Sequence, residues 1–255
     1  MAQPDAETLL NSLEVRLNAY AVCQVENGYG LRFGPNQSAV VSFILKGEGT
    51  IESGGRTIEI RAGSIVIVPK NSPKQINALG PTTSVVDVAD RCPITDGIPK
   101  VGACRSKADL VMVCGSVAAT LGAAGLFDHL QQTLVERPSH RAAQSLFDML
   151  FSELSEPGAG TRVFAEATMK QLFLLLLRDH VEEHGWLSPF SMPLVDASLG
   201  RAVTAVLARP QDPHSVEGLA SLAGMSRSSF ARRFTESYGR SPKDFVQAVR
   251  LQSAA

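Results

Sequence analysis

The sequence lacks the features that mark membrane-spanning, secreted and disulfide-stabilised proteins. Its longest purely apolar run, Leu172–Leu177, is far shorter than the ~20 residues that a membrane-spanning helix needs. The N-terminal segment has neither the basic region nor the apolar core of a secretory signal, so we expect a cytoplasmic protein. Its cysteines show no Cys-x-x-Cys spacing and have no histidine nearby, which predicts reduced, structural thiols: Cys23, Cys92, Cys104 and Cys114.

The chain also lacks a strong net charge, at −1 over 255 residues, but its charge is unevenly distributed. From Ser198 onward there are eight basic and four acidic residues, a net charge of +4, which leaves −5 for the rest. A small basic module on an acidic body is the asymmetry expected of a modest DNA-contact surface. Charge therefore favours a nucleic-acid partner for the C-terminal part.

The pattern of residues 215–238 predicts two short helices joined by a tight turn. Ala220 is small enough to let a second helix cross closely, and Gly224 accepts the left-handed backbone that such a turn requires. Ser226 is suited to cap the second helix. This is the layout of a helix-turn-helix, whose second helix enters the major groove of DNA. An ordinary helical hairpin is the alternative.

Apolar and basic residues separate cleanly within this segment. The expected core between the helices consists of Leu219, Leu222, Met225, Phe230 and Phe234. The residues left outside it are Arg227, Ser228, Arg232 and Arg233. The second helix is therefore expected to present a basic face to DNA.

The first third of the chain is patterned as short strands separated by glycine turns, typical of a sandwich or small barrel. The expected strands are Val40–Leu45, Gly49–Ser53, Arg56–Ile60, Ser64–Val68 and Ser84–Val88. From about residue 105 the pattern becomes helical, with helices over Arg141–Ser155 and from about Val163 to His184. These helices are expected to form a hairpin that packs on the barrel or on a second subunit. Pro189 and Pro193 indicate a linker.

Both parts of the chain resemble a known family. Leu219-Ala220, Gly224-Met225-Ser226, Phe230-x-Arg232-x-Phe234, Gly239-x-Ser241-Pro242 and Phe245 are similar to the AraC/XylS transcriptional regulators. Segments 45–49 and 62–69 look like the two signature turns of the cupin barrel. The resemblance implies an α+β protein: a cupin-like ligand-sensing barrel (1–110), a helical dimerisation segment (111–185), a linker (186–197) and an all-α DNA-binding module (198–255).

The barrel segment departs from the metal-dependent cupin enzymes, which hold a divalent ion with histidines and a glutamate. It contains no histidine, and Lys74 stands where the second motif would place one. A protonated lysine repels a cation. We therefore expect no metal, no cofactor and no enzyme activity, with a cupin enzyme as the minor alternative.

The AraC/XylS family that this chain resembles has two helix-turn-helix units joined by a connecting helix, whereas this sequence ends within that helix. We expect a shortened chain with the first unit only, and a single unit makes fewer phosphate contacts. The main expectation is a ligand-responsive, DNA-binding regulator that forms a homodimer. A non-DNA-binding oligomerisation partner or antagonist is the alternative.

The resemblance also implies roles for individual residues. Ser228, Ala231 and Arg232 match the base-facing positions, and Arg232 can pair with guanine. Arg227 and Arg233 are expected at phosphates. Ser241 begins a helix whose N–H groups can bind another phosphate.

Polar residues of the barrel segment are candidate anchors for the small-molecule effector: Arg32, Ser42, Lys46, Lys74 and Gln75. If Lys74 or Arg32 points inward, an anionic effector is favoured. Arg137 and Arg141 have the R-x-x-x-R spacing of PilZ domains, which bind a cyclic dinucleotide through paired guanidinium groups. The alternative for this arginine pair is a solvated helix face.

Overall fold

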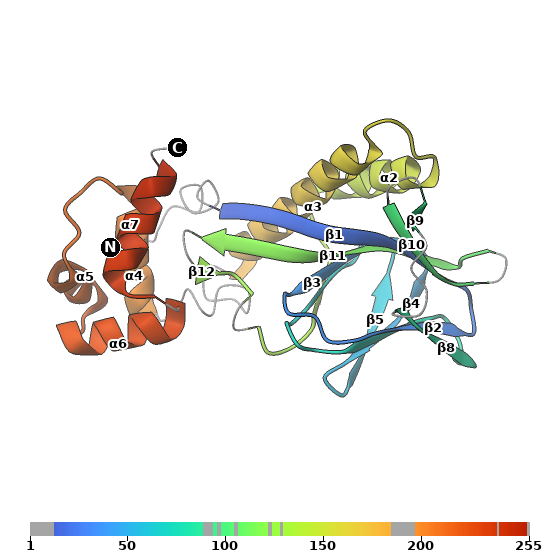
Figure 1. Cartoon of the computed structure of the whole chain (residues 1–255), viewed down its shortest axis with the longest axis horizontal. Coiled ribbons are helices and arrows are strands. Elements are labelled where there is room, and N and C mark those ends of the chain that lie inside the picture. Colours follow the sequence, from blue (N-terminus) through green and yellow to red (C-terminus); the bar gives the residue numbers. More distant parts are fainter. Residues whose placement is uncertain are drawn as a thin grey trace. The chain divides into compact units, whose positions relative to one another are not determined.

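The computed structural model describes residues 13–88, 94–95, 98–104, 107–121, 124–127, 130–184, 197–238 and 240–253 (Figure 1). The chain divides into two compact units. The β-rich unit contains residues 16–117 and 130–179, and the helical unit contains the rest of the chain, including the helices from Ala197 onward. Each unit is described by itself.

The larger sheet, most of which belongs to the β-rich unit, has the strand order β13-β6-β3-β11-β1-β10-β9, with β12 paired to β11. Its strands are β1 (Leu13–Val25), β3 (Val40–Lys46), β6 (Ile65–Val68), β9 (Ile94–Thr95), β10 (Ile98–Ala103), β11 (Leu110–Leu121), β12 (Ala124–Gly125) and β13 (Leu134–Glu136). Most neighbours pair antiparallel, but β1 and β10 are parallel.

The smaller sheet has the order β5-β4-β7-β2-β8. Its strands are β2 (Tyr29–Phe33), β4 (Glu48–Ser53), β5 (Arg56–Arg61), β7 (Lys74–Ala78) and β8 (Ser84–Asp87). The five strands expected from the sequence correspond to β3, β4, β5, β6 and β8. Gly47 joins β3 to β4 at φ 82°, and a Cβ atom there would lie 2.0 Å from the carbonyl oxygen of Asp109. Only glycine fits this turn.

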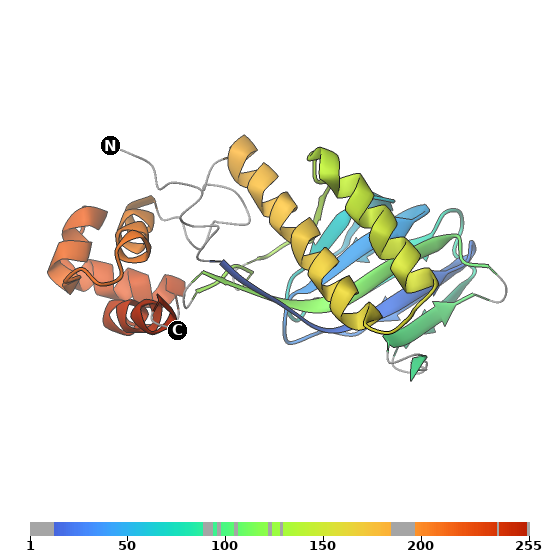
Figure 2. The ribbon, with the colours of Figure 1, turned by 90° about the horizontal axis from the view of Figure 1, so that it is seen from above.

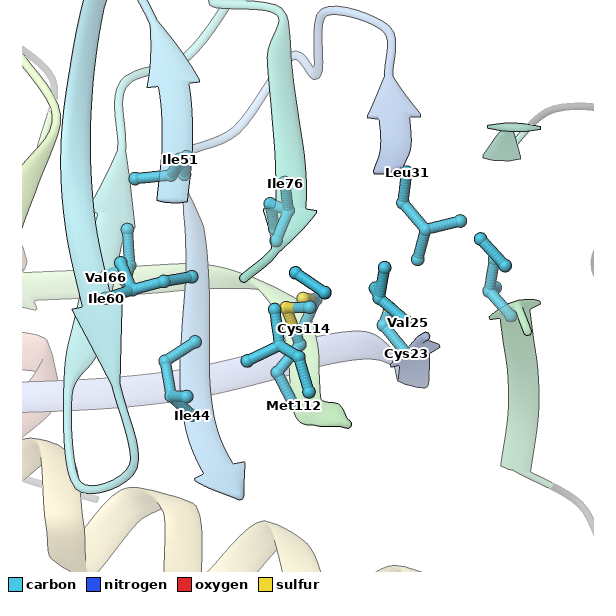
Figure 3. Packing of buried hydrophobic residues seen from close by; sticks show 14 of the residues in the cluster. Cys23, Val25, Leu31, Ile44, Ile51, Ile60, Val66, Ile76, Met112 and Cys114 are labelled. Carbon is cyan, nitrogen blue, oxygen red and sulfur yellow. The ribbon is translucent and has the colours of Figure 1, made fainter. Parts of the chain in front are cut away.

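The core of the unit lies between the two sheets (Figure 3). Ile44 and Met112 come from the larger sheet, whereas Ile51 and Ile76 come from the smaller one, and all four are fully buried. The expected closed barrel is wrong for the described residues, because no strand pairing joins the two sheets. Two facing sheets bury the alternate apolar residues of each strand without closure.

The segment after residue 105 was expected to be helical. This is wrong for the described residues between 107 and 136, which form strands, turns and loops. β11 is a twelve-residue strand within it. Leu110 and Met112 face the core between the sheets, and Val111 faces the opposite side beside Phe151 of α2. A strand that is covered on both faces reads as a continuous apolar run, which periodicity does not distinguish from a helix.

Two helices lie side by side over the outer face of the larger sheet (Figure 2). α2 (Arg141–Ser155) has the expected bounds, and α3 (Thr161–His184) begins two residues before the expected position. The buried carboxylate of Asp179 on α3 accepts hydrogen bonds from the Ser139 hydroxyl and the His140 N–H, at 3.0 and 3.1 Å. This contact fixes the start of α2 against α3. No helix in the described part of the chain is long and apolar enough to cross a membrane.

The helical unit contains α4 (Ala197–Ala208), α5 (Val216–Ala223), α6 (Arg227–Tyr238) and α7 (Pro242–Ser253). Its core includes Phe230, Phe234, Tyr238 and Phe245, whose neighbouring ring centroids lie 4.4 to 5.9 Å apart. Aromatic rings at this spacing pack favourably. Of the expected linker 186–197, only Ala197 is described, and it begins α4; residues 186–196 lie outside the described residues.

Candidate DNA-contact face and ligand cavity

The turn between α5 and α6 has the geometry that its sequence predicts. Gly224 adopts φ 68° and ψ 31°, and its N–H donates to the carbonyl oxygens of Ala220 and Ser221. The Ser226 hydroxyl accepts a hydrogen bond from the Ser229 N–H at 3.3 Å, which caps α6. Ala220 is buried at the crossing. The two helices are therefore held closely, and the first turn of α6 is left exposed.

The exposed face of α6 carries three arginines. Arg227 pairs with Glu217 at 3.1 Å, and Arg232 pairs with Glu236 at 3.2 Å. Both arginine side chains are about 70% exposed. Such surface pairs contribute only about 0–1 kcal/mol, so either guanidinium can exchange its partner for a phosphate or a base. Arg233 is exposed as well.

The other predicted contact residues are placed differently. Ser228 is exposed at the start of α6, and Ala231 is half-buried. Ser241 caps α7: its hydroxyl donates to the Asp244 carboxylate at 2.6 Å and accepts from the Asp244 N–H at 3.3 Å. A carboxylate thus lies at the helix start where a phosphate was expected, and it repels an anion. Gly239 lies outside the described residues.

Two basic residues that contribute to the +4 charge have structural roles. Arg201 donates to the carbonyl oxygens of Leu222 and Ala223, at 2.7 and 3.2 Å, and so caps the end of α5. Arg250 donates to the Pro210 and Asp212 carbonyl oxygens, at 2.8 and 2.7 Å. Their contribution to a DNA surface is therefore smaller than the charge count predicts.

One expected core residue of this segment lies outside the core. Leu222 on α5 is 47% exposed, whereas Leu219 is buried. The Leu222 carbonyl is capped by Arg201, but its side chain points away from the packed helices.

A cavity of about 520 Å³ lies in the β-rich unit. Its wall is mainly apolar, and the charged and sulfur-containing residues in it are few. The residues that matter for its chemistry are Cys23 of β1, Phe33 of β2, Lys74 of β7, Asp87 of β8 and Cys114 of β11. A largely apolar cavity with a few polar groups is the ordinary form of a small-molecule site.

Lys74 is the predicted anchor that the structure brings into this cavity. It is buried, with 4% of its surface exposed, because the first residue of β7 points inward like Ile76 two positions later. Its Nζ atom donates to the Ser42 hydroxyl at 3.3 Å and lies 4.8 Å from the centre of the Phe33 ring. Among the described residues, no carboxylate forms an ion pair with it. An ammonium group that is buried without a carboxylate partner is costly, and it favours a nearby anionic group.

Cys114 was expected to belong to a set of mostly structural thiols, but it lines the cavity that also contains Lys74. A hydrogen bond from Cys23, the positive charge of Lys74 and a hydrogen bond from Ser42 together lower the pKa of Cys114 to about 6, although burial raises it. The lowered pKa favours the thiolate form of Cys114. Nothing in the sequence spacing pointed to this site, because its residues come from strands far apart in the chain.

Arg32 and Gln75 lie outside the cavity. They are paired across β2 and β7, where Arg32 Nη2 donates to Gln75 Oε1 at 3.2 Å. The same polar row continues through Asn77 to Glu52 on the outer face of the smaller sheet. Strand alternation explains this placement, because Gln75 points opposite to its neighbours Lys74 and Ile76.

Lys46 lines a second pocket of about 330 Å³ together with Lys100 and Lys107. Its Nζ atom donates to the Ala108 carbonyl at 3.5 Å. The structure therefore separates Lys46 from Lys74, and the two do not share a pocket.

Arg137 and Arg141 are both exposed. Arg137 Nη2 donates to the Ala62 carbonyl at 3.4 Å, and Arg141 is the first residue of α2. Cyclic-dinucleotide binding by the two arginines stays a prediction. In the described residues, no group of three or more histidine, cysteine or acidic side chains is arranged to hold a metal ion.

Comparison with known proteins identifies the family of the β-rich unit. Residues 7–182, well over half of the chain, match the sequence profile of the cupin family. A structure of ToxT from Vibrio cholerae with a bound unsaturated fatty acid covers 99% of this chain and 81% of that chain. Its identity is 12% and its TM-score 0.32, a likeness too low to carry an argument about this chain.

Curated relatives cover both units. An uncharacterised HTH-type transcriptional regulator of Haemophilus influenzae is 27% identical over 219 residues, which are 85% of this chain and 72% of that protein. The HTH-type transcriptional regulator MtrA of Neisseria gonorrhoeae is 31% identical over 134 residues, which are 52% of this chain and 44% of that protein. These relatives are transcriptional regulators and not enzymes, which confirms both the resemblance and the expectation of no enzyme activity. The chain belongs to the cupin family, and it is related to transcriptional regulators of the AraC/XylS type.

Proposed function

We propose that this chain is a ligand-responsive transcription regulator whose α5–α6 pair is a DNA-binding helix-turn-helix. The observation that carries the proposal is the exposed, arginine-bearing face of α6 behind a left-handed Gly224 turn. A helix held in this way projects its first turns outward, as recognition helices do. The named relatives are HTH-type regulators, which supports the same function.

Within this face, Arg232 reads a base and the other arginines bind phosphates. Arg232 lies one turn into α6, where a guanidinium can pair with the O6 and N7 atoms of guanine. Arg227 at the helix start and the neighbouring Arg233 position the helix on the backbone. Ser228 and Ala231 are small enough to allow close approach to base edges.

The test is fluorescence anisotropy of a labelled duplex over a range of salt concentrations. Arg227→Ala is expected to weaken binding to all sequences and to lower the slope of log affinity against log salt by about 1. The matched control is Arg209→Ala, which removes an exposed arginine that also pairs with an acidic residue, Asp212, but lies outside α6. If both substitutions lowered the DNA affinity and the salt slope equally, the proposal that the α6 face contacts DNA would be refuted. A folded chain without DNA affinity would favour the oligomerisation partner instead.

The effector site of the proposed regulator is the cavity that contains Lys74. Its apolar wall and single buried ammonium group favour a small organic anion. Native mass spectrometry of the freshly purified chain tests this: a co-purified acidic organic molecule that is lost in Lys74→Met supports it. Lys46→Met, at the other pocket, is the control and should retain the molecule.

The effector acts by shifting the population of conformations in which the helix-turn-helix is available to DNA. A ligand shifts such an equilibrium only by its differential affinity for the two states. DNA affinity is therefore expected to change with the concentration of an anionic cavity ligand, and the change should disappear in Lys74→Met. An affinity that is independent of a ligand bound in the cavity would refute the coupling.

The proposed regulator forms a homodimer through α2 and α3. The exposed surface of these helices carries Met149, Val163 and Phe164, which are 46%, 73% and 40% exposed. Exposed apolar side chains that gather on one pair of helices favour association. Light scattering after gel filtration tests this: Phe164→Glu should give a monomer, and a wild-type monomer would contradict the proposal.

A further inference from the structure

Two cysteines from neighbouring strands meet in the cavity. Cys23 lies on β1 and Cys114 on β11, and these strands are adjacent in the larger sheet. Both side chains belong to the same buried core, which Figure 3 shows, and both line the same cavity. Cys23 hydrogen-bonds to the sulfur of Cys114. Adjacent strands lie about 4.7–4.9 Å apart, so two cysteines that point into the same core from neighbouring strands can come within the range that a disulfide spans.

Three features make Cys114 the reactive member of the pair. It lines the 520 Å³ cavity, so a small reagent that enters the cavity meets its sulfur. Lys74 and Ser42, which hydrogen-bond to each other at 3.3 Å, stabilise the thiolate form. Cys23 is the donor in the hydrogen bond to the sulfur of Cys114, so Cys114 is the member of the pair whose thiolate form is stabilised. The Cys23 thiol also lies 3.9 Å from the Ala21 carbonyl oxygen, at the limit of a weak hydrogen bond.

The charged groups around the two sulfurs are few. From β7 comes the Lys74 ammonium group, and from β8 comes Asp87, which lines the same cavity. β3 contributes the neutral Ser42. Lys74 is therefore the basic residue of the cavity wall whose charge can balance a thiolate at Cys114. The thiolate in turn neutralises the Lys74 ammonium group.

We propose that Cys114 and Cys23 form a reversible disulfide, and that its formation raises the affinity of the cavity for an anionic ligand by uncovering the charge of Lys74. The second half of the inference rests on the proposed effector site. The oxidant is a hydroperoxide, of which hydrogen peroxide is the simplest.

The chemistry proceeds in two balanced steps. The Cys114 thiolate attacks a peroxide oxygen, so that the S–O bond forms, the O–O bond breaks and hydroxide leaves, with sulfur oxidised and peroxide reduced. The Cys23 sulfur then attacks the sulfenic acid: the S–S bond forms, the S–O bond breaks, and the Cys23 proton leaves with the hydroxyl group as water. A dithiol reductant reverses the reaction through a mixed disulfide.

Oxidation changes the charge of the cavity. In the reduced form the thiolate and the Lys74 ammonium group neutralise each other. In the disulfide form the thiolate is gone, and Lys74 is left buried with the neutral Ser42 and the Phe33 ring. An incoming carboxylate or sulfonate then supplies the missing negative charge through a charge-assisted hydrogen bond. By linkage, bound anion favours the oxidised form to the same extent.

The first test maps the disulfide in the full chain after treatment with hydrogen peroxide. Peptide mass spectrometry without reduction should find the Cys23 and Cys114 peptides joined, and a dithiol should separate them. Cys104→Ser is the matched control and should still form the bond, whereas Cys23→Ser and Cys114→Ser should not. Cys114 that is oxidised without a link to Cys23, or linked instead to Cys104, would overturn the inference.

Alkylation of Cys114 by iodoacetamide tests the role of Lys74 separately. Lys74→Met should slow alkylation several-fold near pH 7 and much less near pH 9, because the thiolate fraction falls when its counter-charge is removed. Lys74→Arg, which keeps the charge, should restore most of the rate. A residue with only a packing role would change the rate equally at both pH values, and that result would overturn the assignment.

The charge coupling is tested with anilinonaphthalene sulfonate, a fluorescent anion that enters apolar cavities. The oxidised chain is expected to bind this probe about 10-fold more tightly than the reduced chain, and Lys74→Met should remove the difference. Equal affinity of the two forms would overturn the coupling. If no disulfide formed but the probe still bound, the inference would be overturned and the proposed effector site would be unaffected. A disulfide with no probe binding to either form would contradict the effector site and, with it, the coupling.

Discussion

The pH dependence of folding stability should report the charge of Cys114. Folding lowers the pKa of this thiol from 9.0 to about 6, chiefly through the hydrogen bond from Cys23 and the charge of Lys74. Because the folded-state pKa is depressed, the stabilisation is fully present above the ordinary pKa and is lost as the pH falls through the folded-state value. A change from 9.0 to about 6 corresponds to about 4 kcal/mol at high pH.

The perturbation is Cys114→Ser, which keeps a small polar side chain but does not titrate in this range. The free energy of unfolding of the wild type, minus that of the variant, should increase by about 3 kcal/mol from pH 6 to pH 9. Cys104→Ser is the control. Burial and Glu26 raise the pKa of Cys104, so this variant should not show the same increase with pH.

Urea unfolding followed by circular dichroism, with a reductant present to keep the thiols reduced, measures both differences. Measurements at about pH 6, pH 7.5 and pH 9 cover the window in which the thiolate forms in the folded chain but not in the unfolded one. The difference in unfolding free energy between wild type and Cys114→Ser could instead stay constant within about 1 kcal/mol over this pH range. The Cys114 thiolate would then contribute nothing to stability, and its lowered pKa would be refuted.

Other substitutions test the helical unit. Gly224→Ala places a Cβ atom on a left-handed residue and should destabilise this unit by about 1 kcal/mol in thermal unfolding, with Gly224→Asn less harmful. Phe234→Ala removes a ring that contacts three other aromatic side chains, and should cost about 3–5 kcal/mol in urea unfolding. Glu236→Gln releases Arg232 from its ion pair, and should raise duplex affinity a few-fold at low salt in anisotropy measurements. An unchanged stability or duplex affinity in any of these three variants would contradict the turn, ring packing or ion pair that it tests.

The local structure of the helical unit could be predicted because its signals are local. Gly224, Ser226 and the spacing of Phe230 and Phe234 each determine the backbone within a few residues, and the structure has the expected turn, cap and core. The charge count was less informative. It does not distinguish an arginine that faces solvent from Arg201, which caps a neighbouring helix.

The β-rich unit was harder to predict because its contacts join distant segments. Residues 110–115 of β11 are buried on both faces, so this apolar run lacked the alternation that reveals a half-buried strand. The cavity depends on which face each strand presents and on pairing between β1 and β11, neither of which a single sequence specifies. Lys74 was therefore one candidate among several, and Cys114 was assigned only a structural role.

Sequence reading by α6 can be tested by selection from a randomised duplex library. The wild-type chain is immobilised, bound duplexes are amplified over several rounds, and the enriched pool is compared with pools from Arg232→Ala and Arg209→Ala. We expect one enriched sequence motif with wild type and with Arg209→Ala, and loss of preference at a guanine position with Arg232→Ala. No enriched motif with the folded wild-type chain, or the same motif with Arg232→Ala, would contradict it.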